Sequence, residues 1–138
     1  MLKTTLFIFS LSLVTLCMSQ DTSHELVVKV HNIKHFKGSL KYALYDDSEK
    51  FLKEAFTSGG AAIEDHTIVF KVGGLKDGTY AVSIFHDEND NGELDANWIG
   101  IPSEPYAFSN NAKGKFGPPD FDACQFELNE STEITIEL

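Results

Sequence analysis

The chain has 138 residues, 21 acidic against 11 basic side chains, a formal net charge of −10 and no arginine. Proteins bind phosphate backbones through clustered basic side chains, and especially through the arginine fork, so the composition argues against nucleic acid as a partner. Binding to an anionic membrane surface is disfavoured for the same reason.

The first residues have the pattern of a secretory signal peptide. A single positive charge, Lys3, precedes an apolar run over residues 6–16 that is too short to span a membrane comfortably. Small residues stand at the two positions that signal peptidase reads, so we predict cleavage between Ser19 and Gln20. Residues 1–19 are then the signal peptide, and we expect a secreted or periplasmic protein.

Lipidation of Cys17 is the alternative fate, although Leu16 is not the small residue that usually precedes a lipidated cysteine. Residues 20–138 are predicted to form one domain, in which no segment is apolar enough to be a transmembrane span. Cleavage removes Lys3 and no acidic residue, so the mature chain becomes one charge unit more negative. It also leaves Cys124 as the single cysteine, which excludes an intramolecular disulfide.

Apolar and polar residues alternate along much of the chain, as in half-buried β-strands. The alternating segments are residues 26–31, 40–45, 67–72, 80–86, 123–128 and 132–138. Residues 48–56 change to a helical period, with Asp46 or Asp47 as a cap and Gly59-Gly60 as the end. Short strands with a single helix predict an all-β fold, an antiparallel β-sandwich with one short helix.

Residues 87–95 place oxygen-bearing side chains at alternate positions around Gly92, where the chain must turn sharply. If Asp87 is position 1 of a calcium-binding loop, Glu93 is at position 7 and offers its backbone carbonyl. The side chains at positions 1, 3, 5 and 9 are Asp87, Asn89, Asn91 and Asp95. This spacing predicts a calcium site.

Trp98 occupies the position at which a helical EF-hand has its bidentate glutamate, so a calcium site here lies on a β-scaffold. It needs a further ligand, and Glu104, Asp120 and Asp122 are the nearest acidic candidates. Asp, Asn and Gly are also typical of an ordinary tight turn. Both interpretations stay open, and the crowding of five acidic residues within residues 87–95 favours the cation.

Residues 97–122 show no helical or strand period, although they contain all four prolines and the only tryptophan. Exposing so many aromatic rings to water would be unfavourable, so we expect a long ordered loop that packs as a cap on the sandwich. Its aromatic side chains either attach the cap to the core or line a ligand groove. For a groove, the candidate contacts to a carbohydrate or protein ligand are Trp98, Tyr106 and Phe108.

A carboxylate-based hydrolase is the enzymatic alternative, with Asp87 and Glu104 as acid and base and His86 transferring protons. The sequence contains no motif of a serine hydrolase, a zinc enzyme or a dithiol enzyme. His86 falls on the apolar face of its strand, and Cys124 lies in an alternating segment, so structural roles are expected for both. We predict no catalytic residue.

A series of motifs resembles the bacterial domain-of-unknown-function family 2141. They are the Asp-rich turn at 86–95, the Gly-Ile-Pro-Ser-Glu segment at 100–104, Phe-Ser-Asn-Asn at 108–111 and Phe-Gly-Pro-Pro at 116–119. Pro105 and Ala107 stand where glycines are expected around Tyr106. The resemblance implies a small exported bacterial protein with an immunoglobulin-like or transthyretin-like sandwich, and it implies no activity.

Together these patterns predict an exported β-sandwich that acts as a binding or structural module, with a calcium-stabilised loop and no catalytic activity. An accessory role in envelope assembly, through an open edge strand, is the alternative in a different class.

Overall fold

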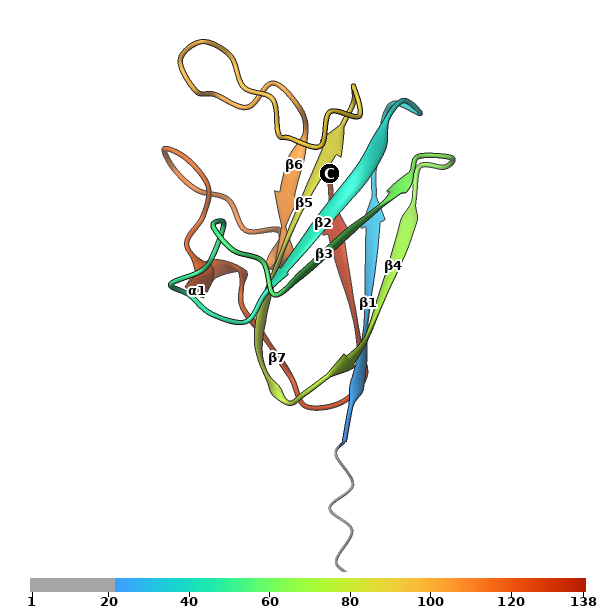
Figure 1. Ribbon diagram of the computed structural model, residues 1–138, viewed down its shortest axis with the longest axis vertical. Coiled ribbons are helices and arrows are strands. Elements are labelled where there is room, and N and C mark those ends of the chain that lie inside the picture. Colours follow the sequence, from blue (N-terminus) through green and yellow to red (C-terminus); the bar gives the residue numbers. More distant parts are fainter. Residues whose placement is uncertain (1–21) are drawn as a thin grey trace, which may run out of the picture.

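Two β-sheets pack face to face in the computed structural model, which describes residues 22–138 (Figure 1). The predicted signal peptide, its cleavage position and Cys17 lie outside the described residues. In chain order the elements are β1 (His24–His31), β2 (Ser39–Tyr45), β3 (Thr57–Ala62), β4 (Ile68–Leu75), β5 (Gly78–Asp87), β6 (Tyr106–Phe108), the 3-10 turn η1 (Ser109–Asn111), α1 (Phe121–Cys124), β7 (Phe126–Leu128) and β8 (Thr132–Glu137).

One sheet has three strands in the order β4-β1-β8, and the other has the path β3-β2-β5-β6, with β7 also paired to β5. The predicted β-sandwich is therefore confirmed. The expectation of purely antiparallel pairing is wrong for one pair, because β1 and β8 run parallel with Val28 opposite Ile134. A parallel pair needs a long crossover, and here the whole chain between the two strands supplies it.

The main core lies between the two sheets and follows the alternation of the strands. Leu26, Val28 and Val30 of β1 are fully buried, and they face Leu40 and Leu44 of β2 across the interior. Burying each such side chain contributes about 1.5–3 kcal/mol, so this interface is the main source of stability.

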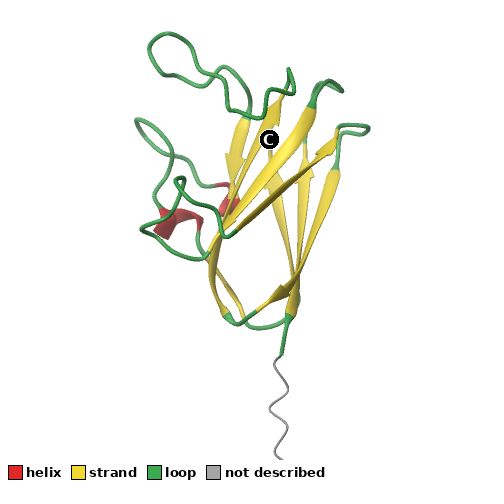
Figure 2. Ribbon diagram, in the orientation of Figure 1, coloured by secondary structure: helices red, strands yellow, loops and turns green. Residues whose placement is uncertain are grey.

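A second apolar cluster covers the opposite face of the larger sheet, because Tyr45 and Ala81 alternate with the residues that face the main core. Phe108, Phe121 and Cys124 pack on them from the later part of the chain. This cluster attaches α1 and the segment around β6 to the sheet (Figure 2). Phe108 and Phe121 therefore pack on the sandwich as the predicted cap.

The helix predicted over residues 48–56 is wrong, since the chain there forms hydrogen-bonded turns. Asp47 does cap the first turn, with its Oδ1 accepting the Glu49 N–H at 2.9 Å. Leu52 then takes a φ of +59°, which a continuous helix cannot contain. Phe51 still turns inward and packs edge to face on Phe121, so burial in the second cluster overrides the helical period.

Strand β3 is missing from the sequence prediction because its composition, Thr-Ser-Gly-Gly-Ala-Ala, has no apolar alternation. It forms by pairing with β2, and its small residues leave room for neighbouring side chains: a Cβ at Gly59 would lie 2.8 Å from the Tyr42 ring. The predicted strand at 123–128 is also partly wrong. The short helix α1 occupies its start, and only β7 is extended.

Candidate functional site

The Asp/Asn-rich loop of residues 87–95 starts at the last residue of β5, at the upper end of the sandwich in Figure 1. Asp87 is buried there, and its Oδ1 and Oδ2 accept the backbone N–H groups of Asn91 (3.1 Å) and Gly92 (2.8 Å). Gly38 lies against Asp87 with a φ of +72°, and a Cβ added to Gly38 would lie 2.0 Å from the Asp87 carbonyl oxygen. Only glycine fits at this approach, so two segments together fix Asp87.

Two further side chains of the loop meet at Asp95. The side-chain amides of Asn89 and Asn91 donate to its Oδ2 at 2.6 Å and to its Oδ1 at 3.0 Å. The amide oxygens of the two asparagines accept the backbone N–H groups two residues further along, which defines Asx turns. The structure therefore brings together three of the four predicted side-chain ligands, those of Asn89, Asn91 and Asp95.

Glu104 returns to this loop from a distance in sequence, as one of the three predicted additional acids. Its side chain is buried, and Oε1 accepts the Glu88 N–H at 2.8 Å while Oε2 accepts the Asp95 N–H at 2.9 Å. Asp120 and Asp122, at and beside the start of α1, take no part in the loop's hydrogen bonds. Glu104 thus connects both ends of the loop to the segment that leads into β6.

The chemistry of the loop depends on more than carboxylates. Among residues 22–138, no group of three or more His, Cys, Asp or Glu side chains is arranged to hold a metal ion. A hard cation would have to use the amide oxygens of Asn89 and Asn91, each of which retains a second lone pair, with Asp95 and the Glu93 carbonyl. The donor set is chemically suited to calcium because all of these ligands are oxygens.

The groups of the hydrolase alternative are engaged in holding the fold. His86 is buried, and its Nε2 lies 2.6 Å from the Lys37 carbonyl oxygen. Both oxygens of Asp87 and both oxygens of Glu104 accept backbone N–H groups. These three side chains therefore hold neighbouring backbone segments in place by hydrogen bonds. This is the structural role expected for His86.

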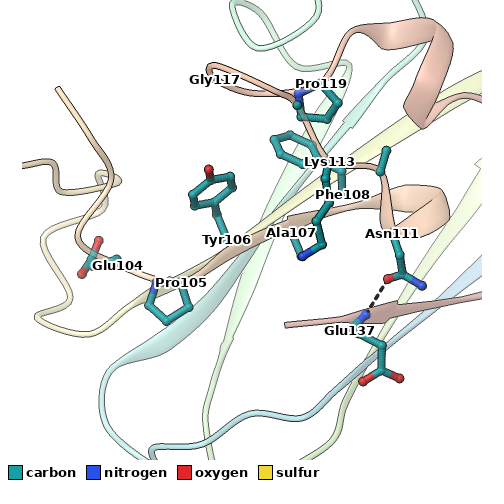
Figure 3. Close-up of a pocket in the computed structure, with 12 residues that line it drawn as sticks. Glu104, Pro105, Tyr106, Ala107, Phe108, Asn111, Lys113, Gly117, Pro119 and Glu137 are labelled. Carbon is teal, nitrogen blue, oxygen red and sulfur yellow. Dashed lines mark hydrogen bonds between the residues drawn. The ribbon is translucent and has the colours of Figure 1, made fainter.

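A cavity of about 400 Å³ lies alongside β6 (Figure 3). Tyr106 and Phe108, two of the three predicted contact residues, line it together with Pro105, Pro119 and the glycines of the 112–117 segment. The Tyr106 ring is 41% exposed and stands in the cavity, whereas Phe108 is only 5% exposed and belongs mainly to the second cluster. Tyr106 is therefore the aromatic residue best placed to contact a ligand here.

Trp98, the third predicted contact residue, is not part of this cavity. Its side chain is 96% exposed, at the tip of the hairpin that follows the Asp/Asn-rich loop. Phe116 is fully exposed as well. For Trp98 and Phe116 the expectation of a cap packed on the sandwich is wrong, because their loops extend away from both sheets.

Cys124 is buried in the second cluster and makes no disulfide. Burial among apolar neighbours, with a smaller contribution from Asp120, raises the pKa of its thiol to about 11. At neutral pH the group is therefore a protonated thiol with no access to solvent, which fits the structural role expected from the sequence.

Comparison with known families matches residues 28–136 to "Uncharacterized protein conserved in bacteria (DUF2141)". The chain belongs to the DUF2141 family. The resemblance seen in the sequence is thereby confirmed, and the match includes the loop and nearly all of the cavity and of both sheets of this DUF2141 protein. No curated protein and no solved structure matches it.

The sequence patterns did not predict the structural role of the Ser-Asn-Asn turn at residues 109–111, which links several segments of the DUF2141 chain. Ser109 is buried, and its Oγ accepts the Val82 N–H at 2.9 Å and donates to the Cys124 carbonyl at 2.5 Å. Asn110 donates to the carbonyls of Ala123 and Gln125, and Asn111 Oδ1 accepts the Glu137 N–H. Consecutive asparagines, which tolerate the observed positive φ angles, were the available signal.

Proposed function

We propose that this DUF2141 protein is an exported, non-enzymatic binding module in which calcium stabilises the Asp/Asn-rich loop and so fixes the segment that carries the ligand site. The convergence of Asn89, Asn91 and Asp95 within a loop closed by Asp87 is the single observation that supports it. Calcium would supply the positive charge that this crowded acidic loop lacks.

Glu104 supports the coupling between the loop and the cavity. The side chain that accepts the Glu88 and Asp95 N–H groups also lines the cavity, two residues before Tyr106. A change in the loop therefore reaches the ligand site through one rigid, buried side chain and the short chain that follows it.

The ligand class that fits the cavity is a carbohydrate or a segment of a protein. A flat, partly exposed ring such as Tyr106 stacks on the apolar face of a sugar or fills an interface pocket, and Pro105 and Pro119 add rigid apolar walls. A protein segment would lie along β6, which pairs with β5 on one side. Strand β6 has only three residues and follows a proline, which limits backbone pairing with a strand of another protein. It is therefore a poor edge for envelope assembly.

Export rests on the N-terminal pattern of Lys3 and the apolar run over residues 6–16. Among the described residues, no helix is long and apolar enough to cross a membrane. N-terminal sequencing of the protein from culture medium, periplasm and membrane fractions distinguishes cleavage before Gln20 from lipidation at Cys17.

The deciding experiment is calorimetric titration of chelator-treated protein with calcium, combined with thermal melts with and without the ion. We expect micromolar binding and a higher melting temperature, because a ligand at 100 times its Kd adds about 2.7 kcal/mol of stability. Asp95→Ala should abolish both effects, whereas Asp122→Ala, at an exposed acid outside the loop, should abolish neither. Absence of heat and of a melting shift in the wild type would refute calcium binding.

The ligand site is tested separately with glycan and peptide arrays. Tyr106→Ala should lose binding that Phe116→Ala, a change at an exposed ring outside the cavity, retains. If Tyr106→Ala folds and binds like the wild type, the cavity along β6 is not the ligand site.

A further inference from the structure

The hairpin tip of residues 97–101 carries the most exposed apolar surface that the described chain presents in one short segment. Trp98 is 96% exposed, Ile99 56% and Ile101 55%. The tip extends beyond the ends of both sheets at the upper left of Figure 1, and a β-bridge between Ala96 and Pro102 closes its base. The tip projects from the sandwich, and these three apolar side chains are exposed on it.

Four of the five backbone N–H groups of the tip donate to acceptors within it. Asn97 Oδ1 accepts the N–H groups of Ile99 (3.1 Å) and Ile101 (3.0 Å). The Asn97 N–H donates to the Ile101 carbonyl at 2.8 Å, and the Gly100 N–H donates to the Asn97 carbonyl at 2.9 Å. Each of these internal hydrogen bonds lowers the cost of moving the donor out of water, so the tip can enter an interfacial layer at a smaller desolvation cost.

Charge separates the tip from its surroundings. Residues 96–103 contain no charged side chain, in a protein whose charged residues make up 23% of the chain. The base of the tip is acidic, with Glu93 exposed and Asp95 partly exposed. Negative charge at the base repels anionic lipid headgroups, but an uncharged apolar tip enters a zwitterionic surface without that cost.

We propose that the tip of residues 97–101 inserts into the interfacial region of a zwitterionic lipid bilayer, with Trp98 at the level of the headgroups and Ile99 and Ile101 beside it. Tryptophan favours this depth because its ring is apolar and its indole N–H remains able to donate. The tip lies outside the cavity at Tyr106 and its insertion requires no calcium, so this membrane contact adds to the proposed function and stands independently of it.

The test uses residues 20–138, which include every strand of both sheets, and phosphatidylcholine vesicles. Trp98 is the only tryptophan, so its fluorescence reports on the tip alone. We expect a blue shift on vesicle addition and stronger quenching by lipids brominated near the headgroup than by lipids brominated at the chain ends. An unchanged spectrum at saturating vesicle concentration overturns the proposal.

Co-sedimentation with the same vesicles identifies the residues responsible. Trp98→Ala should lower the partition coefficient about ten-fold or more, and Trp98→Phe should lower it less. Phe116→Ala, at a fully exposed ring on a different loop, should leave it unchanged. Equal losses in Trp98→Ala and Phe116→Ala would show non-specific adhesion and overturn the assignment.

Asn97→Ala tests the role of the backbone, since it keeps every apolar side chain and removes the acceptor of two N–H groups. We expect a several-fold weaker partition.

A blue shift that rises with protein concentration without lipid would instead identify a second copy of the chain as the partner, and binding that requires anionic lipid would contradict the charge argument. Calorimetry with calcium on Trp98→Ala separates the two proposals, because this variant should retain the heat of the wild type.

Discussion

Residues 87–104 and residues 105–124 are adjacent in the chain, and they are ordered by opposite means. In the first region two buried carboxylates, those of Asp87 and Glu104, accept four backbone N–H groups and leave the apolar side chains of the tip outside. In the second region Phe108, Phe121 and Cys124 are buried against the larger sheet. Outside the long strands, the chain is thus fixed mainly by buried carboxylates in the first region and mainly by apolar burial in the second.

The difference has a consequence for function. A region held by its own hydrogen bonds needs no contact with the core, so it can project apolar side chains such as Trp98 into the surroundings. A region held by burial keeps rings such as Phe108 and Phe121 against the sheet, and it forms the wall of a cavity beside them. The first arrangement supports the loop and membrane proposals, and the second supports the ligand site at Tyr106.

The largest expected effect comes from breaking the apolar region. Phe121→Ala removes a buried ring that packs against Phe51, and it should lower the free energy of unfolding by about 3–4 kcal/mol. Phe116→Ala removes an equal number of atoms at a fully exposed position and should change it by less than about 0.5 kcal/mol. Urea unfolding measures both. Similar losses would mean that Phe116 packs in solution, against the arrangement described.

A smaller loss is expected from breaking the polar region. Glu104→Ala leaves the N–H groups of Glu88 and Asp95 without an acceptor and should lower the free energy of unfolding by about 2–3 kcal/mol. Glu104→Gln keeps one acceptor and should recover about half of that loss. The control is Glu127→Ala, at an exposed position of β7. If Glu104→Ala is as stable as this control, the loop is held by other contacts.

Sequence patterns predicted best where periodicity reflects burial. The alternation of Leu26, Val28 and Val30 identified β1 because every second residue enters the core. The pattern failed at β3, where pairing with β2 makes a strand of small residues, and at residues 48–56, where Phe51 is drawn into the second cluster. No local pattern contains such long-range contacts.

The candidate site shows the same limit. Alternate spacing was enough to predict that Asp87, Asn89, Asn91 and Asp95 share one loop, because these residues are close in sequence. It could not select Glu104 from three acids, since the selection depends on the path of residues 96–103. Nor could it separate Trp98 from Tyr106 and Phe108, because aromatic composition does not reveal which rings find a surface to pack against.

The smallest expected effect is a pH dependence that belongs to the apolar region alone. Burial first, and Asp120 second, raise the pKa of the Cys124 thiol to about 11, above the value of about 8.5 for an unfolded cysteine. The folded protein therefore holds this proton more tightly, and the stabilising contribution is complete below about pH 8.5 and is lost as the pH rises to about 11. Burial also raises the pKa of Tyr80, so this residue makes the stability fall with rising pH as well. The effect of the thiol must therefore be measured as a difference in unfolding free energy between two proteins. Cys124→Ala lacks the thiol but keeps Tyr80, and the gap in unfolding free energy between the wild type and this variant should narrow over that pH range.

A gap that stays constant would mean that the thiol is solvated in the folded protein. Alkylation of native Cys124 at pH 8 gives a second measurement. We expect it to be as slow as unfolding itself, whereas a solvated thiol would react fast.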